Sequence, residues 1–212
     1  MKWEEFIKVV GNLPVIDTEL LLAGVSDFNS VKVQISRWQK AGKLIQIKRG
    51  IYLLDMPYRK VDVYEPYLAS ILKRPSYISL EKAMEYHNLI PEAVPVWTSV
   101  TTKRPGKFVS KAGTFYYRHI KSSLFWGYDS VTVNKQTAFI ASPEKALLDF
   151  FYLKRVRISF EYLNELRLQN FGKINLNKLL AHARRFEKPG IFHAAEIITK
   201  YIDEHKDEEK VL

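Results

Sequence analysis

The stretch Ser30–Leu54 constrains the fold most, because a helical pattern of apolar residues passes directly into a pattern typical of a β-hairpin. The apolar side chains Val31, Ile35 and Trp38 recur at intervals of four and three residues, which predicts a helix with one buried stripe. We expect this helix to begin with Ser30 as its cap and to end at Gly42. Glycine has no Cβ and readily adopts the left-handed conformation that closes a helix.

The face opposite this stripe is polar and basic when successive residues are advanced by about 100° around the helix. Arginine and lysine side chains can reach guanine acceptors or phosphates, and a small residue such as Ser36 lets the backbone approach. These properties are typical of a helix that lies in the major groove of DNA. The predicted DNA-binding residues of the helix are Asn29, Ser30, Lys32, Val33, Ser36, Arg37 and Lys40.

A predicted hairpin follows, with β-prone runs at 44–47 and 51–54. Gly50 stands between them where a tight turn needs a positive φ, and Lys48 and Arg49 precede it at the tip. In a winged helix the tip of this hairpin, the wing, reaches the DNA backbone or minor groove. We therefore expect Lys48 and Arg49 to bind phosphates. The alternative is a surface helix followed by a purely structural hairpin.

Two shorter helical patterns precede this stretch, at residues 3–10 and after Asp17, which is a plausible helix cap. A loop at 24–29 would connect the second helix to the third. The order helix, helix, helix, hairpin is that of a winged helix-turn-helix. We predict such a DNA-binding domain over residues 1–60, with double-stranded operator DNA as its partner.

Residues 61–212 predict a second domain of the α+β class. Helical patterns at 63–72 and 80–87 give way after Val94 to alternating, β-branched and aromatic runs. We expect four or five antiparallel strands there, and then an all-helical cap that begins at Ser142-Pro143. The whole chain is therefore predicted as a winged helix-turn-helix followed by a mixed domain with a mainly antiparallel sheet and a C-terminal helical cap.

The charge of the chain favours a polyanionic partner. Its formal net charge is +10, and residues 30–60 hold eight Lys and Arg against one acid, Asp55. The sequence has neither an 18-residue apolar run nor the pattern of a signal peptide at its start, so we expect a cytoplasmic protein without a membrane partner. Cysteine is absent, which excludes disulfides and thiolate metal sites.

Motifs of catalysis are missing from the sequence. The five histidines lack metal-ligand spacing, and no nucleophile elbow, Walker or dinucleotide-binding run occurs. We expect Asp149 and Glu144 beside Lys145 to form local ion pairs rather than an acid/base dyad, and His87 to be a partly buried packing residue. The sequence thus predicts no catalytic residue, metal or cofactor. A further alternative is a single-stranded RNA-binding module that uses the basic, aromatic strands between residues 96 and 133.

Five segments follow one another in a fixed order: KRGIYLL, YISLEKAMEYHNLIPE, TTKRPG, FYYRHI and ASPEKALLDFFYL. In this order they resemble, over nearly the whole chain, one family, the AbiEi-type antitoxins of type IV toxin–antitoxin (abortive infection) systems. The resemblance implies a winged helix that represses its own operon and a C-terminal domain that counteracts a nucleotidyltransferase-like toxin. At the wing it implies DNA contact by Lys48 and Arg49. A solitary copy without a toxin gene would act only as a regulator.

Overall fold

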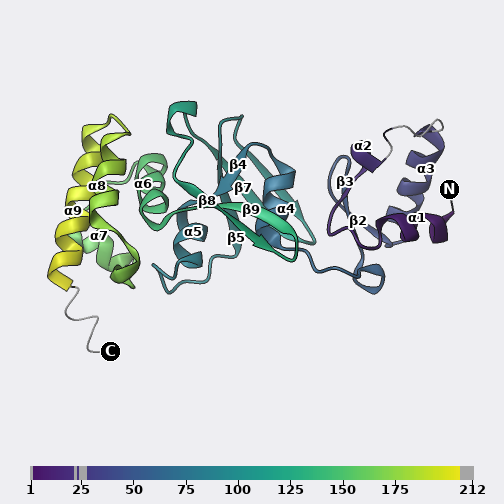
Figure 1. Cartoon of the computed structure of the whole chain (residues 1–212), viewed down its shortest axis with the longest axis horizontal. Helices are drawn as coiled ribbons and strands as arrows, with labels where there is room; N and C mark the ends of the chain where they lie inside the picture. The colour runs from purple at the N-terminus through teal and green to yellow at the C-terminus, as the bar shows by residue number, and fades with distance from the viewer. Residues whose placement is uncertain (1, 22, 24–27, 206–212) are drawn as a thin grey trace.

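The first quarter of the chain forms three helices and a small three-stranded sheet. The computed structural model of the protein describes residues 2–21, 23 and 28–205 (Figure 1). The small sheet is antiparallel, with strand order β1-β3-β2. Its elements are α1 (Trp3–Val10), β1 (Ile16–Asp17), α2 (Thr18–Leu21), α3 (Phe28–Lys40), β2 (Leu44–Lys48) and β3 (Ile51–Leu54).

Helix α3 begins at Phe28, so the predicted start at Ser30 is wrong. A capping preference is worth only about 1 kcal/mol, too little to fix the end of a helix whose apolar face is packed. The predicted loop at 24–29 lies largely outside the described residues. The predicted end is confirmed: Gly42 has a φ of +71°, and the backbone N–H groups of Gly42 and Lys43 donate to the carbonyls of Gln39 and Trp38 at 3.0 and 2.9 Å.

The buried stripe of α3 lies where its spacing predicts. Val31, Ile35 and Trp38 are all buried, and the Trp38 side chain is only 7% exposed. The centre of its ring lies 4.6 Å from that of Phe6 and 5.2 Å from that of Trp3, so two aromatic contacts join α1 to α3. The remaining buried members of this N-terminal core are Val10, Ile16, Leu44 and Leu54.

The predicted hairpin is confirmed as β2 and β3. Gly50 has a φ of +84° at the turn, and its carbonyl accepts from the Thr18 backbone N–H at 2.9 Å and from the Thr18 hydroxyl at 3.0 Å. The Asp17 carboxylate accepts from the Glu19 N–H at 3.0 Å, as its predicted capping role requires. Strand β1 was not predicted, because a two-residue strand has too little periodicity to be recognised.

The second region is built on a six-stranded sheet with the order β6-β7-β5-β4-β9-β8. The sheet is mixed and mostly antiparallel, as predicted, although it has six strands rather than the expected four or five. Two of its pairs, β4 with β9 and β5 with β7, are parallel. The chain passes from β5 to the sheet edge as β6 and returns between them as β7, which makes β5 and β7 parallel. The strands are β4 (Ser76–Ile78), β5 (Val96–Thr101), β6 (Gly106–Ser110), β7 (Gly113–His119), β8 (Tyr128–Val133) and β9 (Gln136–Ala141).

Helices pack against this sheet and form the C-terminal end of the molecule, as predicted; the chain is therefore an α+β protein. Helix α6 is buried along most of its length and lies between the sheet and the last three helices (Figure 1). Its predicted cap is confirmed, since the Ser142 hydroxyl accepts from the Lys145 N–H at 3.4 Å. The helices are α4 (Glu65–Leu72), α5 (Leu80–Tyr86), α6 (Pro143–Lys154), α7 (Phe160–Glu165), α8 (Leu176–Arg184) and α9 (Pro189–His205), with short 3-10 turns at Met56–Tyr58, Ser122–Leu124 and Phe171–Lys173.

The hairpin also belongs to the core of the second region. Ile47, Ile51 and Leu53, together with Val15, join the large hydrophobic cluster formed around the six-stranded sheet. The two faces of the hairpin therefore serve two cores, since Leu44 and Leu54 face the N-terminal one. In the described part of the chain, none of the helices has the length and apolar character needed to cross a membrane.

Candidate nucleic-acid interface

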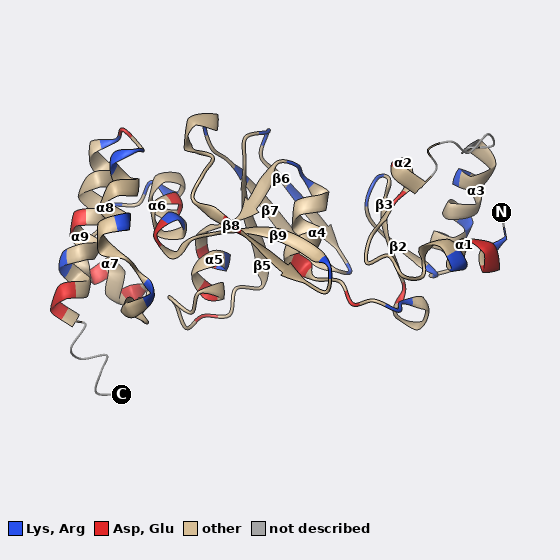
Figure 2. Cartoon of the chain, viewed as in Figure 1, with Lys and Arg blue, Asp and Glu red and all other residues tan. Residues whose placement is uncertain are grey.

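The outer face of α3 carries all seven residues predicted to contact DNA on this helix, and each of them is exposed. Three are cationic, namely Lys32, Arg37 and Lys40. Figure 2 shows Lys and Arg positions of α3 in blue. Val33 is the apolar exception and is 51% exposed. One stripe of α3 packs into the N-terminal core and holds the helix in place. The opposite stripe is exposed and carries short polar and basic side chains. The exposed residues are Asn29, Ser30, Lys32, Val33, Ser36, Arg37 and Lys40.

Side chains on the flank of α3 connect it to the hairpin. The Gln39 amide donates to the Gln46 side-chain oxygen at 3.1 Å, and the Gln46 amide donates to the Tyr52 hydroxyl at 3.4 Å. The Lys43 ammonium lies 4.7 Å from the centre of the Trp3 ring. These residues were not predicted to belong to the surface, because Gln39 falls on the flank of the helical wheel and Lys43 follows the glycine that ends the helix.

The two cations at the tip of the hairpin, Lys48 and Arg49, differ in what they contact. The Lys48 ammonium donates to the Leu72 carbonyl at 3.1 Å and lies 5.7 Å from the centre of the Phe108 ring, so it contacts the second region. Arg49 is exposed at the turn, and within the described residues its guanidinium has no hydrogen bond or ion pair. The structure therefore joins Lys48 to the second region, although the residue is itself exposed, whereas Arg49 has no such partner within the described residues. The pairing of Lys48 with a residue 24 positions later could not be read from local sequence.

A second lysine lies beside Lys48 at this junction. The Lys73 ammonium donates to the Arg104 carbonyl at 2.8 Å. Partial burial, together with the nearby positive charge of Lys48, lowers the pKa of Lys73. Since both cations donate only to neutral carbonyls here, the junction between the hairpin and the β5–β6 loop is positively charged.

The aromatic strands proposed as an alternative RNA platform are largely core. Phe115 and Tyr117 are buried, and the Trp126 ring lies 3.7 Å from the Arg185 guanidinium carbon. Tyr116 is 37% exposed, with the Lys107 ammonium 5.1 Å from its ring centre. Stacking of successive bases needs a row of exposed rings, and this arrangement offers one well-exposed ring rather than a row.

The two carboxylates of α6 are both ion-paired, but only Asp149 forms the predicted local pair with Lys145, since Glu144 pairs with Lys178 of α8. The Asp149 carboxylate pairs with Lys145 and accepts from the hydroxyls of Tyr77 and Ser79 at 2.8 Å each. Burial raises the pKa of Asp149 and lowers the pKa of Lys145, and the attraction between the two opposes both shifts. Both side chains are fully inaccessible to solvent, so a substrate cannot reach them in this conformation.

Glu144, the neighbouring acid, is bound by three donors. Its carboxylate accepts from the Ser142 hydroxyl at 2.8 Å and from the Asn175 backbone N–H at 3.0 Å, and it pairs with the Lys178 ammonium at 3.0 Å. Burial would raise the pKa of Glu144, but these donors outweigh it and leave the pKa below its usual range. Glu144 thus joins the start of α6 to the start of α8.

The histidines and carboxylates were also compared with the arrangement that a metal site requires. The His87 ring donates to the Ala141 carbonyl at 2.7 Å and is partly buried, as predicted. Over residues 2–21, 23 and 28–205, no cluster of three or more His, Asp or Glu is placed to hold a metal ion. Neither a comparison with models of protein families nor one with curated proteins gave a match for this chain.

Proposed function

We propose that the protein is a sequence-specific DNA-binding autorepressor whose N-terminal part is a winged helix-turn-helix. The observation that carries the proposal is the division of α3 into a fully buried stripe and an exposed basic face, followed directly by a hairpin with a cationic tip. A helix that merely covered the surface would need no such hairpin beside it. The proposed partner is double-stranded operator DNA in the cytoplasm, and we propose no catalytic role.

The residues of α3 suit different parts of a base-reading contact. Arg37 can form a bidentate pair with guanine, and Asn29 can do so with adenine. The exposed Val33 offers an apolar contact to a thymine methyl group. Lys32 and Lys40 supply positive charge toward the phosphates on either side of the groove.

At the wing we assign the phosphate contact to Arg49 rather than to Lys48. Because the Lys48 ammonium donates to the Leu72 carbonyl, it is held toward the second region and would have to turn to place one of its other two N–H groups on a phosphate. Arg49 needs no such rearrangement. Each phosphate that a cation neutralises contributes about 0.9 to the steepness with which log affinity falls against log salt concentration, so a phosphate contact by Arg49 should contribute that amount.

The test is a fluorescence anisotropy titration of the full chain against its own upstream DNA and a scrambled duplex over a range of salt concentrations. Arg37→Ala should weaken operator binding by about 1–3 kcal/mol and affect the scrambled duplex less. Arg49→Ala should weaken both duplexes alike and lower the salt slope by about 0.9. Lys48→Ala should change the slope less than Arg49→Ala does.

Lys200→Ala is the matched control, because this exposed lysine lies on α9, away from the proposed surface. It should leave both affinities unchanged. Equal affinity of the wild-type protein for operator and scrambled DNA would refute sequence-specific binding. Unchanged binding by Arg37→Ala would remove α3 from the interface.

We also propose that the second region counteracts a nucleotidyltransferase-like toxin, on the strength of the resemblance to AbiEi-type antitoxins. Co-expression with an adjacent reading frame of that type should restore growth, and Arg37→Ala should retain this protection because the proposed DNA surface is separate. A regulator without a toxin is the second candidate. It would repress its operon but protect no cell from such an enzyme.

A further inference from the structure

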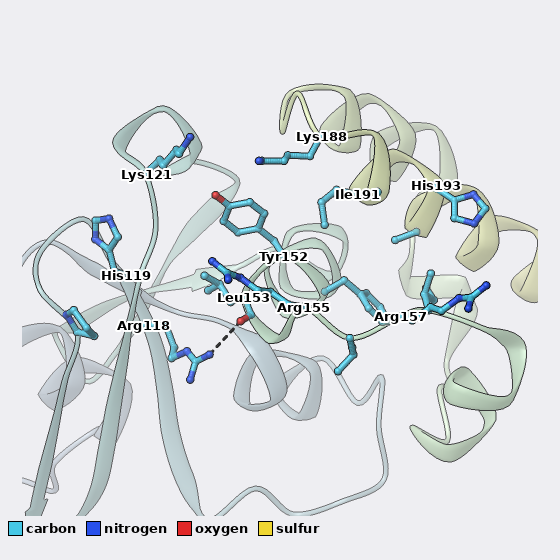
Figure 3. A pocket seen from close by; sticks show the side chains of 16 residues that line it. Arg118, His119, Lys121, Tyr152, Leu153, Arg155, Arg157, Lys188, Ile191 and His193 are labelled. Carbon is cyan, nitrogen blue, oxygen red and sulfur yellow. Dashed lines mark hydrogen bonds between the residues drawn. The ribbon is translucent and has the colours of Figure 1, made fainter.

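A cationic cleft lies at the opposite end of the molecule from α3, among the C-terminal helices. It has a volume of about 1070 Å³ and opens between the end of β7, the segment after α6 and the start of α9 (Figure 3). Five of its lining residues are Lys or Arg, and among the described residues that line it there is no Asp or Glu. The five cations are Arg118, Lys121, Arg155, Arg157 and Lys188.

The cations come from separate parts of the chain and surround one hollow. Lys121 and Lys188 extend from opposite walls near the Tyr152 hydroxyl, while Arg155 and Arg157 belong to the segment that leaves α6 (Figure 3). The Arg118 guanidinium donates to the Leu153 carbonyl at 3.1 Å, which orients it from the strand toward the end of α6. Like charges gathered around one hollow repel each other, and an anion bound between them would relieve that repulsion.

The remaining lining is largely apolar and differs from a simple surface patch of lysines. Val156, Ile158 and Ile191 line the hollow beside Phe151 and Tyr152. The Tyr152 ring is fixed by an edge contact with Phe186 at 5.4 Å between centroids. Small-molecule sites typically combine such apolar walls with a few converging charged groups, in hollows of about 300–1,000 Å³.

We propose that this cleft binds a nucleoside polyphosphate. The phosphates would lie among the cations, where Arg side chains can form bidentate hydrogen bonds with phosphate oxygens. The apolar walls would contact the base and the sugar. The site is independent of the proposed DNA surface, because α3 and α9 lie at opposite ends of the molecule (Figure 1).

Isothermal titration calorimetry of the full chain with ATP tests the proposal. Inorganic triphosphate and adenosine serve as the two halves of the ligand, and a short single-stranded RNA serves as a competing polyanion. ATP should bind with a 1:1 stoichiometry and more tightly than triphosphate, while adenosine alone should not bind measurably. Lys121→Ala with Lys188→Ala should weaken ATP binding by about tenfold or more, as should Arg157→Ala alone.

The matched control is Lys111→Ala with Lys200→Ala, which removes the same charge from exposed positions that do not line the cleft. It should bind ATP as the wild type does, and thermal unfolding should show that each variant is folded. The proposal is overturned if ATP does not bind the wild-type protein, or if the cleft and control double variants weaken ATP binding equally. It is also overturned if the cleft variants weaken the binding of RNA but leave the binding of ATP unchanged.

Discussion

Replacement of Asp149 by alanine tests whether the ASPEKALLD segment serves structure or chemistry. In the folded protein the Asp149 carboxylate neutralises Lys145 and accepts from two buried hydroxyls, those of Tyr77 and Ser79. Both charged side chains have 0% exposure. Asp149→Ala would leave a buried ammonium and two hydroxyl groups without their acceptor.

The magnitude follows from burial. Removal of one partner of a buried ion pair typically costs about 3–5 kcal/mol, because the other charge stays desolvated. In a protein of this size each kcal/mol lowers the melting temperature by about 2–4 °C, so we expect a fall of roughly 6–20 °C. Lys145→Met with Asp149→Leu should recover the part of the loss that comes from the unpaired ammonium, because it removes both charges together, while the two hydroxyls stay without their acceptor.

The assay is urea unfolding at pH 7, followed by circular dichroism and tryptophan fluorescence. Glu81→Ala is a matched control: it breaks the partly exposed Glu81–Lys154 pair at 2.7 Å and should cost less than about 1 kcal/mol. A loss below about 1 kcal/mol in Asp149→Ala would refute the structural role. So would a double variant no more stable than the single one.

Three further predictions concern stability. Trp38→Ala should cost about 3–5 kcal/mol in equilibrium unfolding through the cavity left in the N-terminal core; an equally stable variant would contradict its burial. Burial lowers the pKa values of His87 and His182 from 6.5, so the unfolded chain binds more protons below that pH, and the free energy of unfolding should fall between pH 7.5 and 5.5. His87→Gln with His182→Gln should reduce this pH dependence, and an unchanged slope would contradict the assignment. A fragment of residues 1–60 should show faster amide exchange in β2 and β3 than the full chain does, because Ile47 loses its cover; equal rates would mean that the hairpin does not depend on the second region.

Features fixed by local physics could be predicted from the sequence. The phase of α3 follows from three large apolar side chains at helical spacing, and its end follows from the backbone freedom of Gly42. The start of α6 follows from a serine cap with proline in the first turn. Each of these signals acts over a few residues, so it survives without knowledge of the rest of the fold.

Features that depend on distant partners could not be predicted. Nothing in the pattern of a single strand states whether its neighbour runs parallel, as β5 and β7 do. The cationic cleft joins residues from 105 to 194, and its members have no common spacing in the sequence. Lys48 was assigned to DNA from its place at a hairpin tip, although its observed acceptor, Leu72, belongs to α4.

The position of Lys48 bears on how the two halves of the chain influence each other. Its hydrogen bond with the Leu72 carbonyl and the packing of Ile47 and Leu53 against the large core tie the hairpin to the second region. A hairpin fixed in this way presents Arg49 at a defined place beside α3, which would reduce the entropy lost in the proposed DNA binding. A partner that altered the packing of the second region near Leu72 would therefore also alter the hairpin, whereas one that contacted only the far C-terminal helices would have to act through the sheet between them.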